Sequence, residues 1–144
     1  MREYVITTDS TVDLPKEYLR EYQVQAVSLS YEIEGETYED LNGLEPAVFY
    51  EKMRNGAMPT TSQANSEDIK KCWLPYVEKG IDILYLGFSS GLSGSVNSGR
   101  IAAQELMEEY PEITIRVVDS LCASMGEGLL LYYAVKMKEE GKSM

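Results

Sequence analysis

The chain has 144 residues, of which 44% are hydrophobic and 26% charged, and its formal net charge is −11. This length and composition indicate one globular domain with an ordinary core and exclude a disordered chain. The 13 basic residues are scattered through an acidic sequence, which argues against binding to nucleic acid or to an anionic membrane surface.

The sequence contains no histidine. This excludes a Ser-His-Asp or Cys-His mechanism, a histidine general base and the common zinc sites. Cys72 and Cys122 lie far apart with no Cys-x-x-Cys motif, as expected for free thiols in a reducing compartment. The N-terminus has no signal-peptide pattern, and the longest apolar run, residues 129–135, is too short to span a bilayer. We therefore expect a cytoplasmic protein without stable membrane insertion.

The first half of the chain is predicted to alternate short strands and helices. Residues 4–8 form an apolar strand that ends at Asp9, and a short helix starts at Pro15, because proline is favoured at the first helical position. Residues 24–33 alternate in their second half, as a strand with one solvated face does. The next elements are a turn at Gly35, a return strand over 36–39 and a helix over 46–55 with Val48, Phe49 and Met53 on its inner side.

A turn-rich patch over residues 58–65 opens the second half. Asn65 and Asp68 are spaced as a cap for a helix that runs towards Glu78, and Pro75 is expected to kink or shorten this helix. The remaining predicted elements are a strand over 81–86, a helix over 96–110, a strand over 113–118 and a helix over 123–140. Strands that alternate with helices predict an α/β fold, a parallel sheet with helices on both faces.

The segment 87–99 holds five serines and four glycines. It follows a predicted buried strand and overlaps the start of a helix. A loop of this kind offers unpaired backbone N–H groups beside several hydroxyls, and the helix dipole favours negative charge there. The segment therefore predicts a site for a small anion, either a carboxylate or a phosphate.

Other polar clusters also follow predicted strands or precede helices: residues 8–11, 60–63 and 119–120 with Ser124. Ligands of an open parallel sheet bind beyond the carboxyl ends of its strands, so we expect these clusters to converge. Asp9 and Asp119, which each end a strand, would either hold a metal or accept hydrogen bonds from nearby backbone N–H groups. Their loops supply no third carboxylate for a metal, which favours the second interpretation.

Four motifs resemble, in the same order, those of the DegV family of bacterial lipid-binding proteins: residues 8–15, 59–63, 89–95 and 118–126. The resemblance implies the α/β fold (EDD fold) of the family's N-terminal domain. Well-understood members of the family are fatty-acid-binding subunits of a bacterial fatty acid kinase. They hold the carboxylate of a long-chain fatty acid and present it to a separate kinase, which makes acyl phosphate for phospholipid synthesis. By this resemblance the chain binds a fatty acid, is not itself an enzyme, and uses no cofactor or metal.

The resemblance also implies which residues bind. Thr61, Ser62 and Ser93 are expected to hydrogen-bond the fatty-acid carboxylate. Ser95 and the backbone N–H groups of Ser93 and Gly94 are added from the geometry of the loop. Neutral donors suit this task, because each hydrogen bond to a charged group contributes roughly 1.5–3 kcal/mol without a tight ion pair. The supporting residues are Asp9, Ser10, Ser89, Ser90, Asp119 and Ser120.

Two features depart from the family pattern. Ala64 and Asn65 follow the second motif, where the family usually has Pro and then Ser or Thr. The second departure is length, since full members carry a second domain that supplies much of the acyl tunnel. We therefore expect residues 1–144 to be a DegV-like N-terminal lipid head-group domain without the second domain, a fragment or truncated copy, with the tail pocket largely outside it.

Two other functions stay open at this point. A phosphate-binding or phosphoryl-transfer half-domain would use the segment 87–99 together with Asp9 or Asp119. Nucleotide binding is disfavoured, because Gly94 is not followed by Gly-Lys-Ser/Thr and Gly126-Glu-Gly128 lacks a third glycine. The other alternative is a structural interaction module without a ligand.

Overall fold

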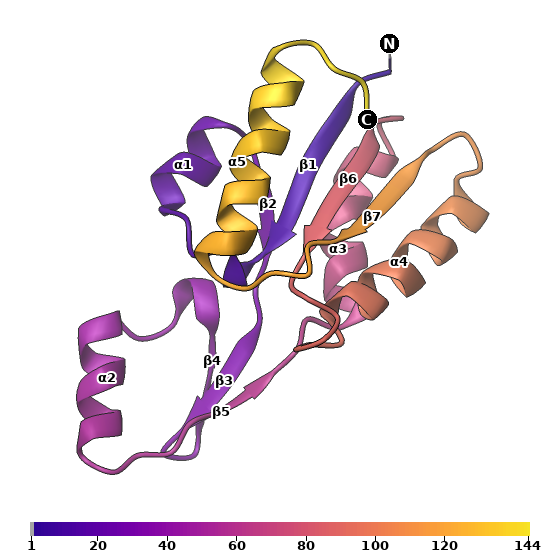
Figure 1. Cartoon of the computed structure of the whole chain (residues 1–144). Helices are drawn as coiled ribbons and strands as arrows, with labels where there is room; N and C mark the ends of the chain where they lie inside the picture. The colour runs from indigo at the N-terminus through magenta and orange to yellow at the C-terminus, as the bar shows by residue number, and fades with distance from the viewer. Residues whose placement is uncertain (1) are drawn as a thin grey trace.

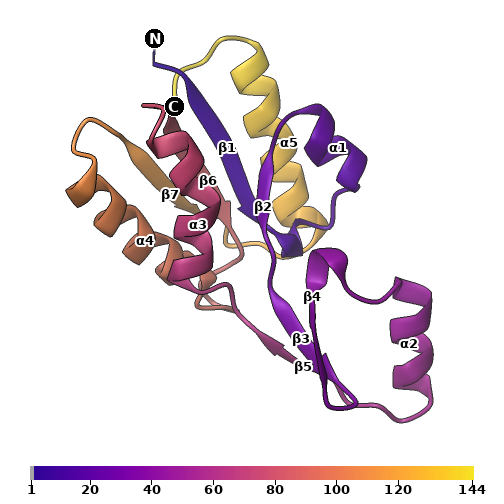
Figure 2. The ribbon, with the colours of Figure 1, turned by 180° about the vertical axis from the view of Figure 1, so that it is seen from behind.

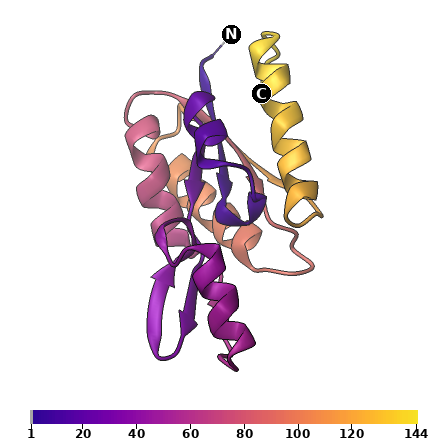
Figure 3. The same ribbon diagram turned by 90° about the vertical axis from the view of Figure 1, so that its left-hand side faces the viewer.

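The computed structural model describes residues 2–144, whose centre is a four-stranded parallel sheet with the strand order β2-β1-β6-β7 (Figure 1). Its strands are β1 (Tyr4–Asp9), β2 (Gln25–Val27), β6 (Asp82–Gly87) and β7 (Ile115–Asp119). Helices cover both faces of the sheet, as the views from behind and from the side show (Figures 2 and 3). The helices are α1 (Lys16–Glu21) and α5 (Met125–Glu139) on one face, and α3 (Ser66–Val77) and α4 (Ser95–Glu109) on the other. The predicted α/β fold is confirmed.

The alternation of side chains along each strand divides the core into two clusters. Val5 of β1 and Ile83 of β6 point to α3 and α4, where Trp73 is fully buried. Tyr4 and Ile6, the neighbours of Val5 in β1, pack instead with α1 and α5. The central strands β1 and β6 are thus buried on both faces, which explains why apolar residues dominate them in the sequence.

A smaller antiparallel unit lies beyond the carboxyl ends of the parallel strands (Figure 1). It has the strand order β4-β3-β5, with a short 3₁₀ helix η2 and the helix α2 after β4. Its elements are β3 (Ser30–Ile33), β4 (Glu36–Glu39), η2 (Asp40–Asn42), α2 (Pro46–Arg54) and β5 (Thr60–Ser62). The unit therefore stands next to the edge of the parallel sheet at which α/β proteins bind ligands.

The single strand predicted over residues 24–33 is wrong, because the structure divides it between the two sheets. Between β2 and β3, residues 28 and 29 form hydrogen bonds with residues outside this segment. The Leu29 N–H donates to Ser10 Oγ, and Ser28 Oγ accepts from the Leu41 N–H. The turn-rich patch over 58–65 likewise contains β5, which pairs with β3. These partners are distant in sequence, so no local pattern marks them.

The predicted inner face of the helix over 46–55 is also wrong in part. Every residue of α2 is at least partly exposed, with Val48 and Met53 at 44% and 42%. Phe49 is half-buried and packs its ring edge-on against Tyr31 of β3, with ring centroids 5.1 Å apart. Because α2 stands apart from the main layers, as Figure 1 shows, it lies against the small antiparallel unit and not against a deep core.

The helix boundaries agree closely with the cap signals in the sequence. The Asn65 side chain accepts the Asp68 N–H at 2.9 Å and caps α3, as predicted. Pro75 lies inside α3, whose last residue is Val77. The helix α4 begins at Ser95, so the serine- and glycine-rich connection between β6 and α4 is limited to residues 88–94, called the Ser/Gly loop below. Among the described residues, no helix is long and apolar enough to cross a membrane.

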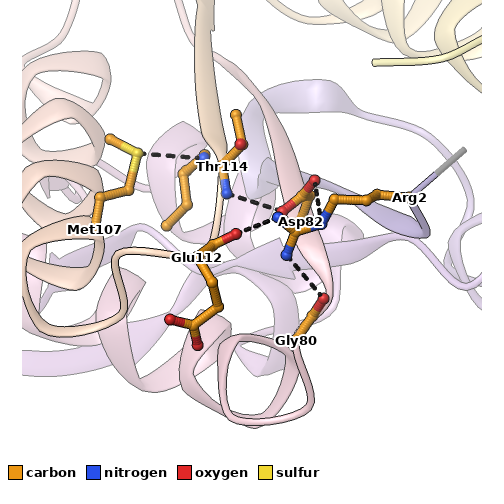
Figure 4. Close-up of polar contacts among 7 residues, drawn as sticks. Arg2, Gly80, Asp82, Met107, Glu112 and Thr114 are labelled. Atoms are coloured by element: carbon orange, nitrogen blue, oxygen red, sulfur yellow. Dashed lines mark hydrogen bonds and ion pairs between the residues drawn. The ribbon is translucent and has the colours of Figure 1, made fainter.

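The amino ends of the central strands are tied together by one buried carboxylate (Figure 4). Asp82 accepts the Thr114 N–H at 2.8 Å and pairs with Arg2, whose Nε lies 3.4 Å from its Oδ2. The Arg2 guanidinium also donates to the carbonyls of Gly80 and Glu112. These contacts hold the amino ends of the strands together, while the predicted site residues gather at the opposite end of the sheet.

Candidate functional site

Two carboxylates hold the Ser/Gly loop in place. Asp9, at the end of β1, accepts the Phe88 N–H with Oδ2 at 2.9 Å. Asp119, at the end of β7, accepts the Ser90 N–H with Oδ1 at 3.1 Å. The hydrogen bonds from Ser90 lower the pKa of Asp119. Both aspartates thus order backbone N–H groups, and no cluster of three or more His, Cys, Asp or Glu residues that would suit a metal is found among residues 2–144.

The supporting serines complete this scaffold by bonding to the backbone. Ser89 Oγ accepts the Gly91 N–H at 3.2 Å, and Ser120 Oγ accepts the Cys122 N–H at the same distance. Ser10 accepts the Leu29 N–H at 3.0 Å, which joins the end of β1 to the start of the antiparallel unit. Ser89, Ser10 and Ser120 are buried, so they shape the site.

The N-terminus of α4 carries two serines that share a hydrogen bond. The hydroxyl oxygens of Ser93 and Ser95 lie 2.9 Å apart, and the Ser95 N–H donates to Ser93 Oγ at 3.2 Å. Ser93 is half-buried, whereas Ser95 is fully buried. The Ser93 N–H donates to the Ser89 carbonyl at 3.0 Å. This corrects the expectation that the Ser93 N–H is free for an anion, because the tight turn of the loop uses it.

The strand β5 meets the N-terminus of α4. The Ala64 N–H, just after β5, donates to Ser95 Oγ at 3.3 Å. Gln63 lies against Gly94, where a Cβ atom would come within 2.7 Å of the Gln63 Cδ. Thr61 and Ser62 of β5 are exposed. The structure therefore brings the motif at residues 59–63 against the motif at residues 89–95, as predicted for polar clusters at the carboxyl end of a parallel sheet.

A pocket of about 600 Å³ opens between the carboxyl end of the parallel sheet and the antiparallel unit. Thr61 and Ser10, two of the predicted site residues, line it. Its apolar wall comes from the segment after β1, from β3, from η2 and the connection that follows it, and from α2: Leu14, Tyr31, Leu41, Leu44, Phe49 and Tyr50. The Tyr31 hydroxyl accepts the Leu44 N–H at 2.8 Å and so fixes part of this wall. The sequence did not point to this pocket, because Leu14 and Leu44 lie in connections without a periodic pattern and Phe49 was predicted to lie on the inner side of its helix.

A second carboxyl group lies behind Asp9, and the sequence analysis did not single it out. Glu127, in the first turn of α5, is fully buried, as is Asp9. Thr11 Oγ1 lies 2.6 Å from Asp9 Oδ1 and 2.8 Å from Glu127 Oε2. Burial and then the nearby Asp9 raise the pKa of Glu127 to about 8. The signal in the sequence was a charged residue between two glycines, Gly126 and Gly128, at the start of an apolar helix.

Comparison with known proteins places this arrangement in a family. The sequence profile of the DegV family matches residues 3–144. The chain belongs to the DegV family. It is 46% identical over 146 residues to a DegV domain-containing protein of Clostridium perfringens, covering 100% of this chain and 50% of that protein. It thus spans about half the length of the curated DegV relatives it matches.

Solved DegV structures share the fold closely. A stearic acid-binding protein from Eubacterium ventriosum superimposes with a TM-score of 0.91 at 33% identity, over 98% of this chain and 49% of that chain. A fatty-acid-binding DegV protein from Thermus thermophilus gives 0.89 at 36% identity, over 100% of this chain and 50% of that chain. The resemblance seen in the four motifs is confirmed, and so is the parallel sheet flanked by helices.

Proposed function

We propose that this DegV chain binds a long-chain fatty acid, with the carboxylate at the junction of β5 and α4 and the tail in the adjoining pocket. One observation carries the proposal. Thr61 belongs to the polar junction through β5 and also lines the pocket of about 600 Å³, which has one apolar wall. A ligand with a polar head and an apolar tail fits both surfaces at once. The fatty-acid-binding relatives from E. ventriosum and T. thermophilus support the same ligand class.

The carboxylate end is proposed to use hydroxyl donors. Thr61 and Ser93 are the principal ones, since Thr61 faces the pocket and Ser93 is reachable at the start of α4. Ser95 supports them from behind through its hydrogen bond with Ser93. The N-terminal end of the α4 dipole favours the negative charge. Side chains alternate along a strand, so Ser62 points to the other face of β5 from its neighbour Thr61. Ser62 is the last residue of β5, and it is proposed to reach the carboxylate only because the strand ends there.

The tail is proposed to supply most of the affinity. Each buried CH₂ group contributes about 0.8 kcal/mol, so a long acyl chain gains more from an apolar pocket than the head gains from hydrogen bonds. The pocket volume lies within the range of roughly 300–1,000 Å³ that small-molecule sites occupy. Leu14, Leu44 and Phe49 line the apolar wall against which the first part of the tail is proposed to pack.

The finer proposal is that the chain does not act on the lipid but presents it, in the cytoplasm, to a partner kinase for acyl-phosphate formation. The exposure of Thr61 and Ser62 supports this, because a head group held beside them is open to a second protein. The absence of histidine from the sequence removes the commonest general base. Neutral hydroxyls also leave the carboxylate oxygens more nucleophilic than an ion pair would.

The test compares palmitate binding by the wild-type chain with Thr61→Ala, Ser93→Ala and the matched control Thr60→Ala. Thr60 is also exposed on β5 but points to the opposite face from Thr61. Loss of one hydrogen bond to the carboxylate is expected to weaken binding about tenfold or more, at roughly 1.5–3 kcal/mol. The control should bind like the wild type. The proposal fails if no variant differs from the control, or if neither palmitate nor oleate binds.

A further inference from the structure

Asp9 and Glu127 are two buried carboxyl groups bridged by a single hydroxyl. Thr11 Oγ1 lies 2.6 Å from Asp9 Oδ1 and 2.8 Å from Glu127 Oε2, and both carboxyl side chains are fully buried. The other Glu127 oxygen, Oε1, accepts from Thr8 Oγ1 at 3.3 Å. None of the described Lys or Arg side chains forms an ion pair with either carboxyl group. The arrangement therefore has to be balanced by protons and not by a cation.

The number of hydrogens available to this cluster indicates which of the two carboxyl groups is protonated. A threonine hydroxyl has one hydrogen, so Thr11 donates to only one of its two close carboxyl oxygens. Asp9 is equipped as an anion, because it also accepts the Thr11 and Phe88 N–H groups and the Tyr85 hydroxyl. Glu127 has no such set of donors. Thr11 therefore donates to Asp9, and the contact of 2.8 Å with Glu127 is satisfied when Glu127 donates its own O–H to Thr11.

We propose that Glu127 is held as a neutral carboxylic acid and is a positioning residue for the fatty-acid site, acting through Thr11 on Asp9. The inference rests on the proposed function. Asp9 fixes the first N–H of the Ser/Gly loop through Phe88, so its position bears on Ser93 and the head of the ligand. The proton on Glu127 lets the two carboxyl groups lie side by side behind the loop.

The same cluster reaches the tail pocket. The 3₁₀ helix η1 (Ser10–Val12) contains Thr11, and the adjoining Asp13 and Leu14 line the pocket. The helix α5 presses closely on η1, since a Cβ atom at Gly128 would come within 2.8 Å of the Val12 carbonyl oxygen. Because α5 and η1 are packed so closely, we expect a change in the contact between Glu127 and Thr11 to displace Asp13 and Leu14 in the pocket wall.

Ionisation of Glu127 is expected to loosen this arrangement. The titratable groups that face it are Asp9 of β1, Asp13 after η1 and Tyr85 of β6. Burial first, and then Asp9 and Asp13, raise the pKa of Glu127, while the hydrogen bond that Thr8 donates lowers it, with a net value of about 8. Above that pH, two like charges share one hydroxyl, which favours separation of η1 from α5. Fatty-acid affinity is therefore expected to fall in mildly alkaline solution.

The experiment measures palmitate affinity between pH 7 and 9 for the wild type, Glu127→Gln and the control Glu139→Gln. Glu139 is an exposed residue near the end of the same helix. A glutamine at 127 keeps an acceptor for Thr8 and a donor for Thr11 but does not titrate. The wild type and the control should lose affinity up to about tenfold by pH 9, because only the protonated fraction binds well. Glu127→Gln should show the same affinity at both pH values.

Infrared spectroscopy of the ligand-free chain provides an independent measurement. A band from a protonated carboxyl group should be present at pH 7, disappear towards pH 9 and be absent from Glu127→Gln. Absence of this band from the wild type, or the same alkaline loss of affinity in Glu127→Gln, overturns the role of Glu127 alone. Absence of palmitate binding at every pH overturns the proposed function and the positioning role together, even when the band is present.

Discussion

The stability of the chain should depend on pH through one buried side chain. The pKa of Glu127 rises from an ordinary value of 4.5 to about 8 in the folded chain, first because of burial and then because of Asp9. Between pH 4.5 and about pH 8, the folded chain therefore keeps a proton on Glu127 that the unfolded chain has already released. The stabilisation is fully present below about pH 4.5 and is lost progressively as the pH rises through about 8.

The size of this effect follows from the two pKa values. Each tenfold change in proton affinity corresponds to about 1.4 kcal/mol, so the difference between 4.5 and about 8 sets an upper limit of about 5 kcal/mol. Movement of the cluster on ionisation reduces this figure. We expect the wild type to lose about 2–4 kcal/mol relative to Glu127→Gln between pH 5 and pH 9.

Urea unfolding at a series of pH values measures the difference directly. The free energy of unfolding of Glu127→Gln is subtracted from that of the wild type at each pH, so that the other titrating groups cancel. Glu139→Gln is treated in the same way and should give a difference that does not change with pH, because Glu139 is exposed. The reasoning is refuted if the difference for Glu127→Gln is also flat, since Glu127 would then titrate alike in both states.

Two further substitutions test the packing around the site and the core. Gly94→Ala places a Cβ atom in the space that Gln63 occupies and should weaken palmitate binding. The loss of stability should be small, because Gln63 is an exposed, flexible side chain that can move away. Gly91→Ala is the control and should bind normally, since its Cβ atom would lie 3.5 Å from its nearest neighbour. Trp73→Phe leaves a cavity and removes the 3.1 Å hydrogen bond to Thr7 Oγ1, which should cost about 2–4 kcal/mol in urea unfolding; a loss below about 1 kcal/mol would contradict the packing seen at Trp73.

The parallel sheet was predictable because its signals are local. The run over residues 81–86 is apolar because β6 is buried on both faces, and Asn65 marks the start of α3 by the side-chain bond that a helix N-terminus needs. The gathering of the polar clusters at one edge followed from a general rule for parallel sheets. The bonds that Asp9 and Asp119 form with loop N–H groups agree with the predicted alternative to a metal site.

The antiparallel unit and the pocket were not predictable in the same way. The strand β5 has three residues, all polar and exposed, and is a strand only because β3 pairs with it from thirty residues away, as in the pair Tyr31 and Thr61. The pocket wall includes Leu14 and Leu44, which lie in connections and meet only after the chain has folded. Glu127 was also missed, because what makes it unusual is a neighbour, Asp9, that is remote in sequence.

The central claim is that one site recognises a carboxylate and an acyl tail together. Titration calorimetry with palmitate and with 1-hexadecanol, which has the same tail but no carboxylate, tests it most directly. We predict saturable binding of palmitate by the wild-type chain, at least tenfold weaker binding of the alcohol, and a smaller difference between the two ligands in Ser93→Ala. Equal binding of palmitate and the alcohol, or no saturable binding of palmitate, would contradict the account.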